Sequence, residues 1–311
     1  MIAYLRLVRL PNVFTAFADI IAGYFLTNYA MHGTPDWLVF AVLCMISAAL
    51  YLSGMAFNDI ADREEDARVR PGRPIPSGAV PLRGAILCAC GLMMAGIQIA
   101  AWTGRSTLIV AAVLSTAIIA YDFVCKGRTL AGPLALGVCR FSNVLLGMSA
   151  AYNSPEALAT LRSAPVWGLP WLPAIASGLY GAGVTAFSAQ EEQGKSGRAL
   201  VLGWVFTGAG LIAAGLLTLN ATEFRIANGV GFLGLAILFY QLASRTRTLI
   251  QAGSPEAARG LVLAGVKGYC PLDFAMLIIF GGLDLCVPAI VAFLLVFPGG
   301  WLRKWLAQGE A

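Results

Sequence analysis

Residues 37–78 of the chain read WLVFAVLCMISAALYLSGMAF and then NDIADREEDARVRPGRPIPSG. The first half, residues 37–57, contains no charged side chain, and as a helix it is long enough to cross a hydrocarbon core of roughly 30 Å. The second half, residues 58–78, is rich in charge and begins where the apolar run stops. The stretch therefore predicts a membrane-spanning helix that ends in a polar site.

Four oxygen-bearing side chains open the charged half of this stretch. Asn58, Asp59, Asp62 and Asp66 stand at offsets 0, 1, 4 and 8. At 3.6 residues per turn these positions fall within roughly 100° of one helical face. Oxygen ligands gathered on one face suit a hard cation such as Mg²⁺. We therefore predict a magnesium site at the end of the helix.

Four arginines follow these ligands at once, namely Arg63, Arg68, Arg70 and Arg73. A cluster that holds both carboxylates and guanidinium groups fits a ligand that is anionic and bound to a metal, above all a pyrophosphate. The alternative is a solvated charged loop between two membrane helices. The binding site is favoured, because a plain loop does not need four oxygen ligands on one face.

Apolar runs recur along the chain, which is 59% hydrophobic and only 12% charged, whereas soluble domains carry roughly 25% charged residues. We expect a multi-pass membrane protein and no nucleic-acid partner. About nine spans are predicted, with approximate ranges 12–30, 37–57, 83–103, 106–123, 131–151, 169–189, 199–219, 226–244 and 274–297. No interval between them can hold a water-soluble domain, so residues 1–311 are expected to form one transmembrane domain, with motif loops at 58–82 and 189–198.

The distribution of basic residues predicts the orientation of the bundle. If the amino terminus is cytoplasmic, fifteen of the 21 Lys and Arg residues lie at cytoplasmic span ends and five at the opposite ends. Cytoplasmic loops carry such an excess of positive charge. The loops after spans 2, 4, 6 and 8 would then share the cytoplasmic face, where residues distant in sequence can form one site.

Three segments resemble the UbiA superfamily of intramembrane prenyltransferases. They are the NDxxDxxxD pattern of 58–66, the RPIPSG segment of 73–78 and the opening RLPNVFTAFADIIAG of 9–23. The resemblance extends over nearly the whole chain. Within the superfamily, the chain most resembles the EboC-like subgroup. It implies an all-α bundle of nine transmembrane helices, with a central cavity open to the cytoplasmic side and to lipid.

The resemblance also implies an activity. A Mg²⁺-dependent prenyltransferase would move an isoprenyl group from a prenyl pyrophosphate to an aromatic or similarly hydrophobic acceptor within the bilayer. The implied catalytic residues are Asp62, Asp66, Arg73, Tyr121 and Lys126. The implied metal ligands are Asn58, Asp59, Asp62, Asp66, Glu191 and Glu192. The substrate-binding residues would be Arg9, Asn12, Asn58, Arg70, Arg140, Asn143, Thr185 and Ser188.

A second polar constellation follows the fourth span. Lys126 comes about a turn after Tyr121, and this order resembles the Tyr-and-Lys segment of the family. Lys126 would contact the pyrophosphate as a point charge, and Tyr121 would face the reacting allylic carbon. The alternative is an aromatic side chain at the membrane interface beside a snorkelling lysine.

The sixth span ends in Thr185, Ser188, Glu191 and Glu192, which lie at offsets 0, 3, 6 and 7 on one helical stripe. This stripe stands where the family carries paired aspartates, and it departs from that pattern. Two functions therefore stay open. The protein transfers an isoprenyl group, or it only binds or translocates a lipid-linked or aromatic metabolite.

Ionisable residues inside predicted spans are functional candidates by default, among them Asp19, Arg140 and Asp284. Asp19 and Arg140 would lie at similar depths and could form an ion pair. Alternatively, Arg140 and Asn143, one turn apart, could line the cavity and orient an acceptor. Asp284 falls in the middle of the ninth predicted span, and we expect it to face the bundle interior.

Overall fold

The computed structural model describes residues 2–31, 33–166, 168–193, 197–220, 226–299 and 302, except the side chains of residues 189–193. Within these ranges the chain is almost entirely helical and contains no strand. The long helices are α2 (Phe14–Ala30), α3 (Trp37–Ala61), α5 (Leu82–Thr103), α6 (Arg105–Ala120), α7 (Ala131–Ser149), α9 (Leu172–Gln193), α10 (Gly197–Gly215), α11 (Ile226–Ala252), α12 (Pro255–Lys267) and α13 (Tyr269–Gly281). The shorter elements are α1 (Ile2–Leu7), η1 (Leu10–Asn12), α4 (Arg63–Val69), η2 (Tyr121–Cys125), η3 (Ala150–Tyr152), α8 (Pro155–Ser163), η4 (Leu216–Asn220), η5 (Gly282–Leu285) and α14 (Cys286–Leu294).

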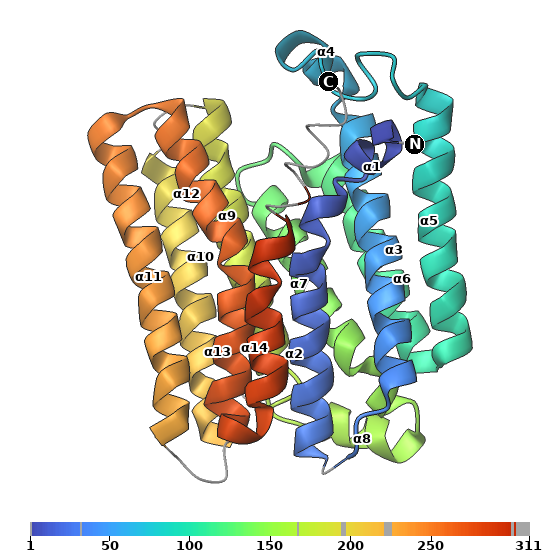
Figure 1. Cartoon of the computed structure of the whole chain (residues 1–311), viewed down its shortest axis with the longest axis vertical. Helices are drawn as coiled ribbons and strands as arrows, with labels where there is room; N and C mark the ends of the chain where they lie inside the picture. The colour runs from blue at the N-terminus through green and yellow to red at the C-terminus, as the bar shows by residue number, and fades with distance from the viewer. Residues whose placement is uncertain are drawn as a thin grey trace.

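The long helices run roughly parallel or antiparallel to one another, as a membrane bundle requires (Figure 1). Helices α3, α5 and α6 form one side of the bundle, and α9 to α13 form the other. Helices α2 and α7 pack against each other between the two sides. Helices α1 and α4 lie at one end and α8 at the opposite end (Figure 1). This arrangement brings the carboxyl-terminal ends of α3, α6, α9 and α11 to the end of the bundle that carries α1 and α4.

Local sequence explains where several helices begin and end. Asp36 caps α3, because its Oδ1 accepts hydrogen bonds from the backbone N–H groups of Leu38 and Val39 at 2.9 and 3.1 Å. Helices α5 and α6 are separated by Gly104, whose φ is +153°. A Cβ atom at this position would overlap the side chain of Asn153. The sharp turn between the two helices therefore requires glycine.

Small residues allow the central helices to approach closely. A Cβ atom added at Gly147 of α7 would lie 2.7 Å from the carbonyl oxygen of Ile20 in α2. A Cβ atom at Gly137 of α7 would lie 2.8 Å from the carbonyl oxygen of Gly178 in α9. In a bilayer, where lipid is as apolar as the helix faces, such close packing is a main source of helix association.

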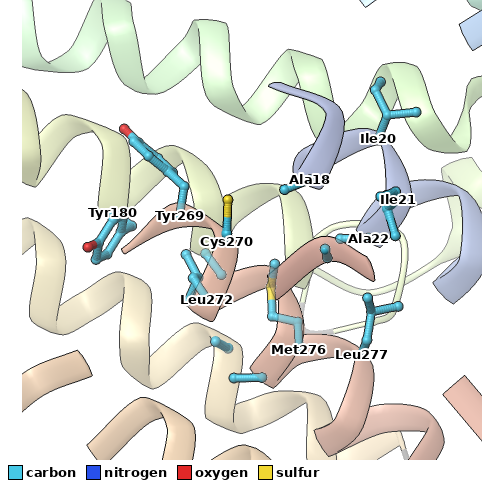
Figure 2. Close-up of a cluster of buried hydrophobic side chains, with 14 of the residues drawn as sticks. Ala18, Ile20, Ile21, Ala22, Tyr180, Tyr269, Cys270, Leu272, Met276 and Leu277 are labelled. Atoms are coloured by element: carbon cyan, nitrogen blue, oxygen red, sulfur yellow. The ribbon is translucent and has the colours of Figure 1, made fainter. Parts of the chain in front are cut away.

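The buried core connects α2, α9 and α13. Figure 2 shows Met276 and Leu277 of α13 beside Ile21 and Ala22 of α2. In contrast, the outer stripe of α11 remains exposed, with Ile226, Leu233 and Tyr240 at seven-residue spacing. Large apolar side chains on the outside of the bundle fit contact with lipid acyl chains. The chain is a multi-pass membrane protein with an all-α bundle.

Eight helical stretches of the described chain are long and apolar enough to cross a membrane. Helix α9 occupies the predicted span 169–189 but is not among these eight. It carries Ser177, Thr185 and Ser188, which face inward rather than toward lipid. The nine-span count therefore stays a prediction.

The prediction that residues 274–297 form one continuous ninth span is wrong. Helix α13 ends at Gly281, η5 turns the chain, and α14 returns beside α13 and α2 (Figure 1). The turn depends on Gly282, whose φ is +58°. Asp284 lies in this turn and is exposed, and it accepts a 2.9 Å hydrogen bond from Tyr29 Oη. The expectation that Asp284 faces the interior is wrong, because hydropathy alone did not mark the glycine turn.

Candidate active site

A cavity of about 330 Å³ lies within the bundle, surrounded by α3, α6, α7, α9, α12 and α13. It follows α3 from Asn58 to Ser47, a separation of eleven positions that corresponds to about 16 Å of helix. Apolar side chains make up much of the wall, namely Met55, Leu114, Ile118, Leu136, Val184, Val262 and Val266. The remaining wall is polar, so the cavity can hold a molecule that is apolar in one part and hydrogen-bonding in another.

Arg9 connects the cavity to the charged end of the bundle. Its Nη2 donates hydrogen bonds to Asn58 Oδ1 at 3.0 Å and to Asp59 Oδ1 at 2.6 Å. The backbone of Arg9 has φ and ψ of 47°, a left-handed conformation that non-glycine residues adopt rarely. Such conformations cost about 1–3 kcal/mol and are concentrated at functional sites. The cost indicates that the position of this guanidinium group matters.

A second opening lies beside Arg9 at the same end. This basin measures about 390 Å³ and is lined by Arg6, Arg9, Asp59, Arg70, Gly72, Arg73 and Pro74. Arg9 lines both the basin and the cavity. Four guanidinium groups around one depression form a site suited to a multiply charged anion.

The predicted motif carboxylates and arginines contact one another in this region. Arg73 Nη1 lies 2.6 Å from Asp59 Oδ1 and 3.8 Å from Asp66 Oδ2. Arg70 Nη1 lies 3.7 Å from Asp66 Oδ1. Asn58 and Asp59 belong to α3, Asp66 belongs to α4, and the helix changes direction at Asp62. The segment predicted as a loop at 58–82 thus contains the end of α3 and the whole of α4.

The segment after α6 forms the other side of the site. Lys126 and Asp62 form an ion pair. Tyr121 lines the cavity at the start of η2, a π-helical turn, and such turns are frequent at functional sites. The next residue, Asp122, is buried in the cavity wall and accepts a 3.1 Å hydrogen bond from Asn58 Nδ2.

A buried network lies deeper in the bundle. Arg140 Nη1 is 2.9 Å from Asp19 Oδ2, and Arg140 Cζ lies 3.7 Å from the ring centroid of Tyr269. Asn143 Nδ2 donates to the same Asp19 oxygen at 3.0 Å, and Ser177 Oγ donates to Asp19 Oδ1 at 3.2 Å. Arg140 thus pairs with Asp19 and also lines the cavity with Asn143, while its role in orienting an acceptor stays a prediction.

Helix α9 contributes Thr185 and Ser188 to the cavity wall. Helices α3 and α9 therefore face a common cavity near the charged end. The backbone of α9 continues through Gln193, but the side chains of Glu191 and Glu192 lie outside the described residues. Residues 194–196 of the predicted loop 189–198 also lie outside them. Asn12 lines the cavity as well.

The side chains predicted to bind Mg²⁺ are only partly arranged as metal ligands. Within the described residues, no group of three or more Asp, Glu, Cys or His side chains is arranged closely enough to hold a metal. Asp59, Asp62 and Asp66 face Arg or Lys partners instead. However, Asp66 Oδ2 is buried and has no hydrogen-bond donor in the described part of the chain. Such an oxygen is available to a cation.

Sequence reasoning missed several residues of this region, among them Arg6, Ser47, Asp122 and Tyr269. Two of them had a usable signal. Arg6 stands one helical turn before Arg9, and Asp122 is a carboxylate within an apolar run. Ser47 and Tyr269 had none, because small hydroxyls and aromatic residues are common in membrane helices.

Sequence comparison finds relatives with two different names. The chain is 34% identical over 161 residues to a digeranylgeranylglyceryl phosphate synthase of Methanothrix thermoacetophila, covering 51% of this chain and 58% of that protein. It is 28% identical over 136 residues to a 4-hydroxybenzoate octaprenyltransferase of Polaromonas sp., covering 43% of this chain and 44% of that protein. The chain thus spans about half the length of the curated relatives it matches.

Comparison with solved structures shows the same fold. A UbiA homologue from Aeropyrum pernix matches with a TM-score of 0.65 and 19% identity over 86% of this chain and 97% of that one. A UbiA homologue from Archaeoglobus fulgidus bound to GPP and Mg²⁺ matches with a TM-score of 0.55 and 14% identity over 97% of this chain and 99% of that one.

A family model also matches the sequence. The UbiA prenyltransferase family model aligns with residues 20–259, which is well over half of the chain. The aligned region contains the 58–78 stretch, η2 and the inward face of α9, so it includes most of the site described above. The narrower EboC-like resemblance stays a prediction. The chain belongs to the UbiA prenyltransferase family.

Proposed function

We propose that this protein transfers an isoprenyl group from a prenyl pyrophosphate to a hydrophobic acceptor within the membrane, with Mg²⁺ as the cofactor. The main observation in support is that Arg9 lines both the largely apolar cavity and the basin with four arginines, which we call the arginine basin. A prenyl pyrophosphate has the same two parts, a charged head joined to an apolar chain. The relatives named for prenyl transfer and the homologue bound to GPP and Mg²⁺ support the proposal.

The basin residues act on the leaving group. Arg9, Arg70 and Arg73 neutralise the charge that grows on the pyrophosphate as the C–O bond breaks, and preorganised electrostatic stabilisation of this kind is usually the largest catalytic contribution. Lys126 adds a further positive charge beside Asp62. The metal would be held by Asp62 and Asp66, with Asn58 and Asp59 nearby, and with Glu191 and Glu192 as proposed further ligands. When bound, Mg²⁺ supplies Lewis-acid stabilisation of the pyrophosphate oxygens.

The reaction is a substitution at carbon 1 of the isoprenyl group. The bond from this carbon to the pyrophosphate oxygen breaks, and both electrons leave with the pyrophosphate. An electron pair of the acceptor forms the new bond to carbon 1, and one proton leaves the acceptor. Tyr121 and the apolar cavity wall surround the allylic cation and exclude water, which would otherwise hydrolyse it.

The test uses the purified full chain in detergent with radiolabelled geranyl, farnesyl and geranylgeranyl pyrophosphates and a panel of acceptors. We expect Mg²⁺-dependent pyrophosphate release that falls by about 10²-fold or more in Asp62→Ala and Asp66→Ala, because charge stabilisation of this kind is worth several kcal/mol. The matched control is Glu65→Ala, since Glu65 shares α4 with Asp66 but points to the exterior. Mg²⁺-dependent binding without release would instead favour a protein that binds or translocates its ligand.

We further propose that the charged end faces the cytoplasm, as does the amino terminus. The excess of Lys and Arg at this end supports the orientation. The test places single cysteines at Ser77 and Glu156, which are exposed at opposite ends, in a variant lacking the seven natural cysteines. A membrane-impermeant maleimide added to intact cells should label Glu156→Cys but not Ser77→Cys. The reverse labelling pattern would overturn the orientation.

A further inference from the structure

Part of the polar wall of the cavity presents hydrogen-bond acceptors. The hydroxyl of Thr185 donates its proton to Gly181 O at 2.9 Å, and that of Ser188 donates to Thr185 O at 2.7 Å. Ser47 Oγ donates to Asn143 Oδ1 at 2.7 Å. A hydroxyl has one proton and two lone pairs. These three hydroxyls therefore present lone pairs, rather than protons, to a molecule in the cavity.

One further wall group has the same character. Asn143 Nδ2 donates to Ala16 O and to Asp19 Oδ2, both at 3.0 Å, so its two protons are used. A group of the occupant that meets these four side chains is complementary to them only if it donates hydrogen bonds.

Arg140, the cation deeper in the cavity wall, is already paired with a protein carboxylate. Its Nη1 lies 2.9 Å from Asp19 Oδ2. Arg140 also donates to Thr15 O and Thr15 Oγ1, which occupies three of its five N–H groups. An anionic group entering beside Arg140 would gain little from a cation that is already paired.

We propose that the acceptor is a neutral molecule with at least two hydroxyl groups, whose protons are donated to hydroxyl oxygens among Thr185, Ser188 and Ser47. This inference rests on the proposed prenyl transfer and specifies its acceptor. A carboxylate or a phosphate on the acceptor would face lone pairs and balanced charge, so it is disfavoured. The remaining N–H groups of Arg140 can donate to a neutral hydroxyl oxygen.

The test compares acceptors that differ in charge but share a skeleton. The purified full chain receives geranylgeranyl pyrophosphate and Mg²⁺ with either hydroquinone or 4-hydroxybenzoate, and in a second pair with either geranylgeranylglycerol or its phosphate. Acceptor-dependent pyrophosphate release and the mass of the product are measured. We expect kcat/KM to be at least about tenfold higher for the neutral member of each pair, the effect of roughly one lost hydrogen bond to a charged group.

The outcomes separate this inference from the proposed function. A higher or equal value for the anionic member of either pair, or a prenylated product from none of the four, overturns the neutral acceptor. Absence of both Mg²⁺-dependent donor binding and pyrophosphate release counts against prenyl transfer itself. Donor-dependent release with an anionic preference leaves the transfer intact and removes only the present inference.

Two variants sharpen the test. Thr185→Val removes the lone pairs but keeps the branched shape, and it should raise the KM for the neutral acceptor about tenfold with the donor KM unchanged. Thr116→Val is its control, because Thr116 Oγ1 also donates to the carbonyl four residues earlier, at 2.9 Å, but faces the exterior of α6. Asp19→Asn, checked for monodispersity, frees the charge of Arg140 and should shift the preference toward the anionic member. An unchanged preference in both Thr185→Val and Asp19→Asn would contradict the proposal.

Discussion

Arg73 shows how single side chains organise the charged end. It bridges Asp59 and Asp66, so it joins α3 to α4 while lining the arginine basin. A guanidinium group that contacts carboxylates from two helices holds both at defined positions. The same group is available to the pyrophosphate, and its loss would affect both the position of the motif and the charge of the basin.

We predict that Arg73→Ala raises the KM for the prenyl pyrophosphate by about 10- to 100-fold, the worth of one or two charge-assisted hydrogen bonds. Steady-state kinetics with varied donor measure the effect. Arg68→Ala is the matched control, since Arg68 lies on α4 with its side chain exposed and outside the basin. Equal effects of the two substitutions would mean that the basin acts only through its net charge.

Asp19 and Asp273 are both buried acids, yet their surroundings differ. Asp19 accepts hydrogen bonds from Arg140, Asn143 and Ser177. Neither carboxyl oxygen of Asp273 has a hydrogen-bond partner in the described part of the chain. Breaking a buried ion pair costs about 3–5 kcal/mol, whereas an unsatisfied buried polar group is itself destabilising by about 1–3 kcal/mol.

The same substitution should therefore have opposite effects at these two positions. We predict that Asp19→Asn lowers the thermal unfolding midpoint in detergent, while Asp273→Asn leaves it unchanged or raises it. Fluorescence-detected melting of the two variants beside the natural chain measures both midpoints. A large fall in Asp273→Asn would show that this carboxyl group has a stabilising partner or ligand.

Helix packing sets the position of the buried network. Asp19 belongs to α2, and Arg140 and Asn143 belong to α7, so the ion pair depends on the close approach of these helices at Gly147. A methyl group at this position meets the backbone of α2 rather than a flexible side chain. The two helices would have to separate to accommodate it.

We predict that Gly147→Ala destabilises the bundle by about 1–3 kcal/mol, the usual cost of overpacking a tight contact. Gly91→Ala in α5 is the control, because a Cβ atom at Gly91 meets no neighbour within 4 Å. Alanine favours the helix over glycine by about 1 kcal/mol, so the control should be neutral or stabilising. Thermal melting in detergent distinguishes the two, and equal midpoints would argue against a tight contact between α2 and α7.

The bundle as a whole places a charged basin at the entrance of a long cavity. Segment 62–81 contributes Arg70 and Arg73 to the basin, and it is connected to the bundle largely through ion pairs and the small apolar cluster around Leu7 and Val80. A ligand that carries both a metal and a pyrophosphate would contact this segment and α3 together. The metal and the pyrophosphate bound together should therefore order the segment more than either one bound alone, because they share their contacts.

We predict that amide hydrogen exchange in residues 63–81 slows by at least about tenfold when Mg²⁺ and a non-hydrolysable prenyl pyrophosphate analogue are added together. Mass spectrometry of peptic fragments measures the exchange. Helix α8, at the opposite end of the bundle, serves as the internal reference and should not change. Full protection by the analogue without Mg²⁺ would mean that the arginines alone form the binding site.

Local patterns were sufficient to predict much of this protein. Apolar runs predicted most of the helices, because the length and composition of a membrane span are properties of a continuous segment. The spacing of Asn58, Asp59, Asp62 and Asp66 predicted a polar site at the end of α3 for the same reason. Thr185 and Ser188 were predicted to bind substrate from their place on one helical stripe, and both lie in the cavity wall.

Other features were decided only when the helices packed. Periodicity shows that a residue shares a face with another, but it does not show which helix lies opposite that face. The pairing of Asp62 with Lys126, the entry of Asp122 and Ser47 into the cavity wall, and the reversal of the chain at Gly282 all depend on neighbours from distant sequence. The sequence alone thus determined a membrane bundle with a charged site at one end. The tertiary structure decided how the charges are balanced and which hydrogen-bonding groups face the cavity, because both depend on contacts between helices.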